Sequence, residues 1–135
     1  MIVMSKRGHL VAGLLLGCIV AILAFAIATK IASAQDPTRL APESYKVLLE
    51  NSQLRAIEYR LKPGEKEPMH SHPCGVFVYY FSEAKIKTTF PDGKTVEASS
   101  KVGDALWRDP ITHAGENIGN TEAHALLVEP KNGCK

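Results

Sequence analysis

The chain has 135 residues, which is enough for one domain of ordinary size. Its formal net charge is +2, but Lys6, Arg7 and Lys30 supply three of the sixteen basic residues. Residues 35–135 therefore carry thirteen basic and fourteen acidic residues, for a formal charge of −1. That balance excludes the strongly basic surface on which nucleic-acid binding depends.

The N-terminal residues have the pattern of an export signal. Lys6 and Arg7 precede an uncharged, almost wholly apolar run over residues 10–28, and small residues follow at Ala32 and Ala34. These are the parts of a secretory signal peptide, and they predict cleavage after Ala34. Because the apolar run has 19 residues, about enough to span a bilayer, an uncleaved membrane anchor is the alternative. The domain is expected outside the cytoplasm in both cases, either periplasmic or secreted, or anchored in the inner membrane.

The rest of the chain predicts an all-β domain. After a polar, proline-containing stretch, short runs rich in β-branched and aromatic residues alternate with Gly and Pro turns. This pattern is typical of an antiparallel sandwich or barrel of about eight to ten strands. The predicted strands are residues 45–50, 54–61, 75–81, 84–90, 95–98, 101–107, 112–117 and 124–129, with turns at Pro63-Gly64 and at "PDGK", residues 91–94. The predicted boundaries are a signal peptide or membrane anchor over 1–34, a linker over 35–45, the β-domain over 46–130 and a C-terminal tail over 131–135.

One predicted strand is apolar on both of its faces. Residues 75–81, "GVFVYYF", do not alternate between apolar and polar side chains, so neither face is marked as the solvent side. This pattern favours a strand that is buried on both faces. We expect the aromatic residues Phe77, Tyr79, Tyr80 and Phe81, and the single tryptophan Trp107, to lie mostly in the core.

Two histidines, His70 and His72, are separated by one residue at the start of the β-rich region. Side chains two apart on a strand point to the same face, ~6.6 Å apart along the chain. Two imidazoles at that spacing can bind one ion, with metal–nitrogen bonds of ~2.1 Å, if a neighbouring strand supplies a third ligand. His113 is the candidate for that ligand, and His124, which shares a strand face with Leu126 and Val128, is read as a core or outer-shell group and a further candidate.

Two more side chains are candidates for the same site. Cys74 follows His72 by two residues and could reach the ion as a thiolate, or form a disulfide with Cys134 in an oxidising compartment. Arg108 lies just ahead of His113 and could pair with a substrate carboxylate, although a solvated surface charge is the alternative.

Two segments resemble the motifs of the cupin family. "GEKEPMHSH", residues 64–72, resembles the first motif, and "GDALWRDPITHAGEN", residues 103–117, resembles the second. The resemblance covers residues 46–130 and implies an RmlC-like double-stranded β-helix, a jelly-roll barrel with the ion held inside. The stretches "PMHSHP", "TFPDGK" and "ENIG" are most similar to small single-domain cupins known as β-alanine degradation proteins.

The chain departs from the family pattern at two places. The first motif usually has a glutamate four or five residues after its second histidine, and Val76 and Phe77 stand there instead. Pro110 also precedes His113 by only three residues, so the loop that bears this histidine is expected to differ. A site of three neutral imidazoles leaves the full charge on a divalent ion, which makes bound water more acidic. This ligand set resembles the three-histidine centres of the cupin thiol dioxygenases, although the rest of the sequence does not.

The sequence therefore predicts an exported small cupin that binds one divalent ion (Fe, Zn, Mn, Ni or Cu) through His70, His72 and His113. By resemblance it would act on a small molecule in a dioxygenase-like or related reaction. The alternative is a non-catalytic domain that binds a small molecule or a metal, and the sequence leaves open whether the protein is an enzyme. We expect a small-molecule ligand, no nucleic-acid partner, a membrane partner only if the signal is uncleaved, and a homodimer that pairs through residues 45–50.

Overall fold

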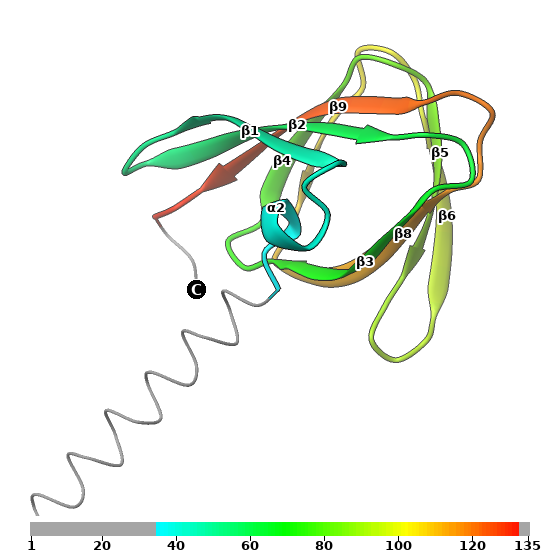
Figure 1. Ribbon diagram of the computed structural model, residues 1–135, viewed down its shortest axis with the longest axis horizontal. Helices are drawn as coiled ribbons and strands as arrows, with labels where there is room; N and C mark the ends of the chain where they lie inside the picture. Colours follow the sequence, from blue (N-terminus) through cyan, green and yellow to red (C-terminus); the bar gives the residue numbers. More distant parts are fainter. Residues whose placement is uncertain (1–34, 133–135) are drawn as a thin grey trace, which may run out of the picture. The chain divides into compact units, whose positions relative to one another are not determined.

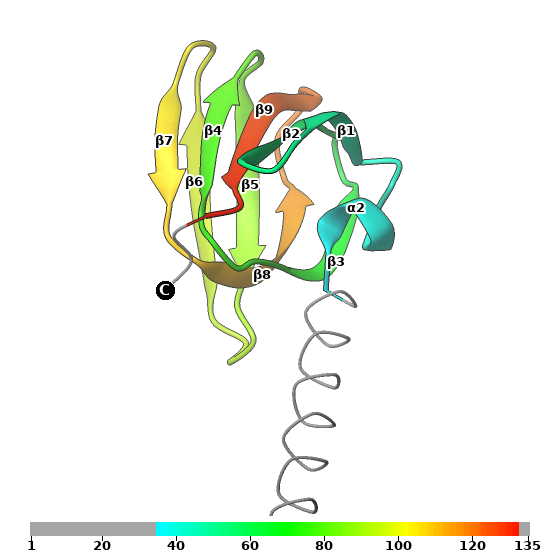
Figure 2. The same ribbon diagram turned by 90° about the vertical axis from the view of Figure 1, so that its left-hand side faces the viewer.

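The strands of the domain form two antiparallel sheets that face each other (Figures 1 and 2). The structure, a computed structural model, describes residues 35–132, so the predicted signal segment lies outside the described residues. No helix within residues 35–132 is long and apolar enough to cross a membrane. The described elements are α2 (Pro37–Leu40), β1 (Tyr45–Glu50), β2 (Leu54–Leu61), β3 (Lys66–His72), β4 (Val76–Tyr80), β5 (Ala84–Thr89), β6 (Thr95–Ser100), β7 (Ala105–Arg108), β8 (Ile111–Asn117) and β9 (Ala123–Pro130).

One sheet has five strands in the order β1-β2-β9-β4-β7, and the other has four in the order β3-β8-β5-β6. Consecutive strands pair in the β1–β2 and β5–β6 hairpins, whereas other neighbours come from distant parts of the chain, as where β2 pairs with β9 and β3 pairs with β8. The prediction of an all-β jelly roll with short strands is therefore confirmed. The two sheets enclose the space in which the inward side chains of β2, β3, β4, β5, β8 and β9 meet.

The inward faces follow the two-residue period of the strands. On β5 the buried residues are Ala84, Ile86 and Thr88, which is the alternation that the sequence predicts. The β5–β6 hairpin turns at Gly93, where φ is +82°, a conformation that side chains disfavour and glycine adopts freely. The buried apolar residues of the core are Ala41, Tyr45, Ile57, Tyr59, Leu61, Val76, Val78, Tyr80, Ala84, Ile86, Ala123, Ala125 and Leu127.

The strand β4 is apolar on both faces, as its sequence shows, but it is buried on only one. Val76, Val78 and Tyr80 point inward, whereas Phe77 lies on the outer face of the five-stranded sheet. Trp107, its cross-strand partner on β7, is 52% exposed. Phe81, directly after β4, is 46% exposed. The prediction that Phe77, Phe81 and Trp107 belong to the core is therefore wrong, because no further layer covers these side chains within the described residues.

The predicted linker, residues 35–45, packs against the domain. Its residues form the short helix α2 and then lead into β1. Pro37 and Ala41 are buried, and Tyr45 is part of the core. The polar composition of this stretch hides these contacts, because few of its buried residues are apolar and they follow no regular period. The segment lies beside β3, which carries the first two histidines (Figure 1).

Candidate metal centre

The three predicted histidines meet inside the barrel. His70 and His72 share the inward face of β3, and His113 lies directly opposite His70 on the neighbouring strand β8. All three are at most 7% exposed. One ring nitrogen from each lies within 4.8 Å of the others, so a single ion could contact all three. The short spacing between Pro110 and His113 therefore does not keep His113 from the site.

The outer hydrogen bonds of the first two histidines fix which nitrogen faces the centre. His70 Nδ1 donates to the carbonyl oxygen of Pro68 at 2.8 Å, and His72 Nδ1 donates to Glu129 Oε1 at 2.5 Å. In a neutral imidazole the other nitrogen, Nε2, then carries the lone pair. The two Nε2 atoms are 3.2 Å apart, an arrangement in which two lone pairs repel unless a cation lies beside both.

His113 has no hydrogen-bond partner among the described residues. Both of its ring nitrogens are buried and unpaired, which is costly for a polar group unless an ion or water satisfies it. Burial lowers the pKa of His113 to about 3, with the neighbouring His70 and His72 adding to the shift. Burial likewise lowers the pKa of His70 to about 4. Both rings are therefore neutral at pH 7, the form that binds metal ions.

A carboxylate that the sequence analysis missed also reaches the interior. Glu67 is buried, although it precedes His70 by three positions and a regular strand would place the two on opposite faces. The register of β3 against β8 shifts between them, since Glu67 pairs with Gly115 and His70 with His113. This bulge turns Glu67 to the inside. Pro68, which cannot donate to a strand ladder, is the sequence signal that could have revealed it.

The Glu67 carboxylate accepts a hydrogen bond from Tyr45 and occupies the space beside Gly115, which has no side chain. Tyr45 Oη donates a short hydrogen bond to Glu67 Oε2 and also lies 3.2 Å from His70 Nε2. A Cβ at Gly115 would collide with the Glu67 carboxylate, so glycine provides the space. Burial raises the pKa of Glu67 to about 6, although the hydrogen bond from Tyr45 opposes the shift.

A small pocket of about 40 Å³ adjoins the histidines. That volume holds about three water molecules, or a ligand group of similar size. Among the described residues that line it, only Glu67 and Arg108 are charged, and none of the ion pairs between described residues involves Arg108. The lining residues are Tyr45, Tyr59, Glu67, His72, Val76, Val78, Tyr80, Ile86, Thr88, Arg108, His113 and Leu127.

The two positions that lack the family's glutamate are not equivalent. Val76 is buried and lines the pocket, whereas Phe77 points away from it. A carboxylate at residue 76 would therefore face the histidines, and one at residue 77 would face solvent.

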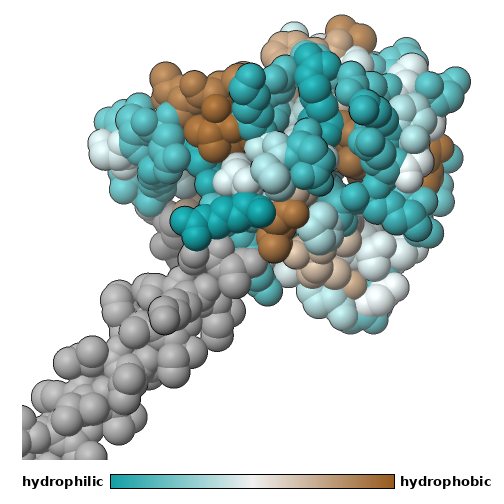
Figure 3. All heavy atoms as spheres, viewed as in Figure 1, coloured by the Kyte–Doolittle hydropathy of each residue, from teal (hydrophilic) through white to brown (hydrophobic). Residues whose placement is uncertain are grey.

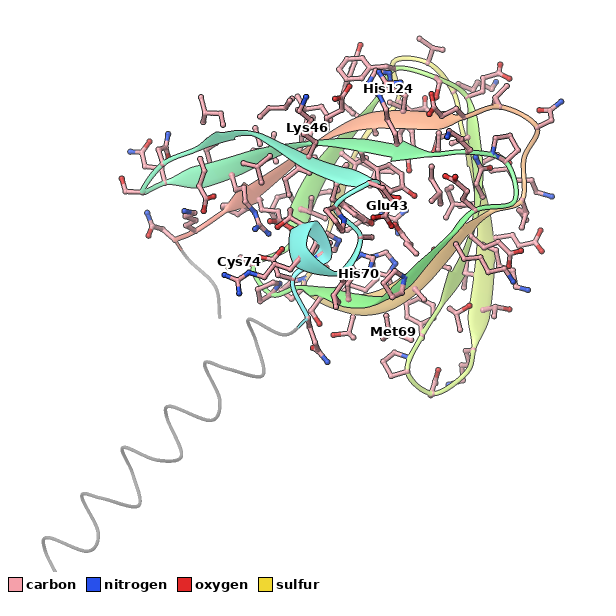
Figure 4. The ribbon with its side chains drawn as sticks, in the orientation of Figure 1. Glu43, Lys46, Met69, His70, Cys74 and His124 are labelled. Atoms are coloured by element: carbon pink, nitrogen blue, oxygen red, sulfur yellow. The ribbon has the colours of Figure 1, made fainter. Side chains whose placement is uncertain are left out.

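The remaining candidates lie outside the cluster. Cys74 is disulfide-bonded, so its sulfur is not a free thiolate; Cys18 and Cys134 fall outside the described residues. His124 lies on the outer face of β9 and its Nε2 contacts Glu58 Oε1 at 3.0 Å (Figure 4). The structure corrects its suggested place near the ion, because the inward face of β9 is formed by Ala123, Ala125, Leu127 and Glu129.

No protein-family profile matches the chain, and no curated protein matches it. Solved structures do. A cupin domain from Bordetella pertussis Tohama I is 23% identical over 64% of this chain and 91% of its own, with a TM-score of 0.59. An RmlC-like cupin with a double-stranded β-helix fold from Methanocaldococcus jannaschii is 16% identical over 64% and 77%, with a TM-score of 0.52. A protein with a double-stranded β-helix domain from Klebsiella pneumoniae is 23% identical over 65% and 76%, with a TM-score of 0.52.

At these identities the similarity establishes the fold and nothing finer. The chain has the RmlC-like cupin fold, an all-β jelly roll, and it brings together three buried histidines that could bind a metal ion. The finer resemblance to β-alanine degradation proteins stays a prediction.

Proposed function

We propose that this protein binds one divalent metal ion through His70, His72 and His113 and acts there on a small molecule. The observation that carries the proposal is the set of three buried imidazoles, of which His113 has both nitrogens unpaired among the described residues. Neutral imidazole suits iron, zinc, copper and nickel, and manganese remains a candidate because Glu67 lies nearby. An ion at this position would polarise a substrate oxygen or make a bound water more acidic.

The charges around the pocket favour an anionic ligand. Glu67 and Arg108 cancel each other among the lining residues, so a divalent ion would leave the pocket with a surplus of positive charge. Arg108, with no ion pair to a described residue, would bind a carboxylate of the ligand through its planar guanidinium. Tyr45 and Glu67 would hold a proton beside the reacting group, since the Tyr45 hydroxyl contacts both the carboxylate and His70.

The competing function is a binding domain that performs no reaction. Both functions use the same pocket, so turnover is the observation that separates them. The experiment reloads metal-free protein with each candidate ion and offers a panel of small carboxylic acids. Oxygen consumption and product mass are followed. Ion-dependent turnover supports the enzyme, whereas saturable binding without product supports the binding domain.

The role of Arg108 has its own matched comparison. Arg108→Gln should weaken binding of small carboxylates by about tenfold or more, because a charge-assisted hydrogen bond is lost. Lys87→Gln, which removes an outward-facing cation of β5, should leave that binding unchanged. Equal effects of the two substitutions would remove Arg108 from the proposed site.

We also propose that the protein is exported and that it works outside the cytoplasm. The basic, apolar and small-residue segments before Gln35 support this, and the mature chain would then begin at Gln35. Mass spectrometry of the native protein tests it, since an intact Met1 would favour the membrane anchor instead.

A further inference from the structure

The residues that begin the described structure are connected to a candidate metal ligand through an unbroken series of ionic contacts. Asp36 Oδ2 accepts from Arg55 Nη1 at 2.7 Å. Arg55 donates from Nε and Nη2 to Glu129 Oε2, at 2.9 and 2.6 Å. Glu129 uses its other oxygen, Oε1, to accept from His72 Nδ1 at 2.5 Å. We call the series Asp36, Arg55 and Glu129 the ion-pair chain.

The groups of the ion-pair chain are shielded from water. The side chains of Arg55, Asp36 and Glu129 are 15%, 23% and 9% exposed. Screening by solvent is weak at such positions, so each contact constrains its neighbour more than a surface ion pair would.

A second connection reaches the same strand from the same segment. Ser71 stands between His70 and His72, and its N–H donates to the carbonyl oxygen of Gln35 at 2.9 Å. Ser71 Oγ donates to Gln35 Oε1 at 2.8 Å. Since β3 is an edge strand of its sheet, this N–H would otherwise face away from any strand partner within the described residues.

We propose that residues 35–41 are a working part of the metal centre, and that Asp36, Arg55 and Glu129 are positioning residues that hold His72 in the orientation and tautomer that bind the ion. This inference rests on the proposed function, because it concerns the affinity of the site for its ion. Outer partners of metal-binding histidines contribute ~10–100-fold to affinity in other proteins, and here that contribution depends on a segment more than thirty residues away along the chain.

The role of each member follows from its chemistry. Glu129 keeps the proton of His72 on Nδ1 and so leaves Nε2 free for the ion. Arg55 lies between two carboxylates and prevents Glu129 from rotating away from His72. Asp36 fixes Arg55 from the other side while its Oδ1 accepts from the Thr38 N–H at the start of α2. Greater mobility of α2 would therefore make the orientation of the His72 ring less well defined.

The test measures Co²⁺ affinity by competition with a chelator, and the visible absorption of bound Co²⁺ as a report on ligand geometry. Full-length chain is used throughout. Glu129→Gln should weaken Co²⁺ binding by ~10–100-fold, and Asp36→Asn, which acts through two further contacts, by about fivefold. Both should change the Co²⁺ spectrum. The matched control is Asp92→Asn, which removes an exposed carboxylate that pairs with Lys94 in the β5–β6 hairpin.

A double substitution separates positioning from a general loss of stability. If Asp36 acts through Glu129, Asp36→Asn should add almost nothing to the loss of Co²⁺ affinity in a Glu129→Gln background. A purely structural effect would add in full. A thermal melt of each metal-free variant shows which of them fold. Arg55→Lys should restore part of the affinity that Arg55→Ala loses, because it keeps the charge without the two-sided geometry.

The experiment distinguishes failure of the proposed metal site from failure of the positioning role. If the wild-type chain binds no Co²⁺, the metal site itself is absent and this inference fails with it. If the wild type binds Co²⁺ and folded Asp36→Asn matches it in affinity and spectrum, the metal site stands and the positioning role of residues 35–41 is wrong.

Discussion

His70 and His72 could be identified from the sequence because the backbone between them is a regular strand. A separation of two residues on a strand always places two side chains on one face. His113 could be named as a candidate third ligand, but its position opposite His70 could not be predicted, because nothing local indicates that β8 pairs with β3. The same rule predicts the wrong face for Glu67, because the bulge between Glu67 and His70 turns its side chain to the inside.

The missing glutamate gives a sharp prediction at this scale. Val76→Glu should tighten divalent-metal binding by about tenfold or more, because it adds a carboxylate to a site that now has only imidazole donors. Phe77→Glu should not change it, because Phe77 lies on the outer face. Chelator competition gives the affinities. A thermal melt of metal-free Val76→Glu should show lower stability, since an unpaired buried carboxyl is costly.

The reverse order, with Phe77→Glu tightening binding and Val76→Glu without effect, would mean that β4 has the opposite face inward. Equal affinities for wild type and both folded variants would mean that the ion binds elsewhere.

The titration of the buried groups predicts how stability depends on pH. The pKa of His70 is about 4 and that of His113 about 3 in the folded protein, against 6.5 for the ordinary side chain. Between pH 6.5 and about 4 the unfolded chain therefore binds protons that the folded chain does not, so stability falls as pH falls. Glu67 acts oppositely between pH 6 and 4.5, because its pKa is raised from 4.5 to about 6. At ~1.4 kcal/mol for each pKa unit, the two histidines outweigh it.

The metal-free protein should accordingly have a lower melting temperature at pH 5 than at pH 7, and Glu67→Gln should make the decrease steeper by removing the opposing group. An unchanged melting temperature across this range would show that His70 and His113 are not neutral and buried in the folded state.

At the scale of elements, the sequence predicts most of the strands. It does not predict the bulge in β3 or the packing of residues 35–45 against the domain. Turn residues and alternation located most strands, as on β5, where the predicted inward residues are the buried ones. Alternation does not say whether a further layer covers a sheet, so it does not predict that the outer apolar residues of β4 are exposed. In residues 35–45, few apolar positions make the contacts, and no periodic pattern marks them.

The Glu67 carboxylate occupies space that Gly115 leaves free on β8. Gly115→Ala should lower the free energy of unfolding by ~1–3 kcal/mol, because the new methyl group would collide with the Glu67 carboxylate. Combining it with Glu67→Ala should recover part of that loss by removing the colliding group. Urea unfolding measures both. Additive losses in the double variant would show that the two residues do not touch.

At the scale of the whole molecule, one edge of the five-stranded sheet is apolar and open. Within residues 35–132 the strand β1 pairs on one side only, with β2, and Leu48 and Leu49 on it are 55% and 52% exposed. Figure 3 shows an apolar area over this strand. Open sheet edges invite pairing with another chain, so β1 remains our proposed site of homodimer formation.

Light scattering at micromolar concentration should therefore give twice the chain mass, and Leu48→Lys together with Leu49→Lys should give the monomer, because like charges would face each other across the pair. A monomeric wild type would remove β1 as an interface.

The central claim is that the three inward histidines form a metal site. The measurement that tests it most directly is the divalent-metal affinity of the purified protein by chelator competition, compared among wild type, His70→Ala, His113→Ala and His124→Ala. The first two substitutions should each weaken binding by at least ~10–100-fold, since removing a ligand costs no less than removing its outer partner. His124→Ala should change it little, because that ring contacts Glu58 on the other face of the sheet. Wild-type affinity in folded His70→Ala and His113→Ala would contradict the account, and the histidines would then be ordinary residues of the barrel interior.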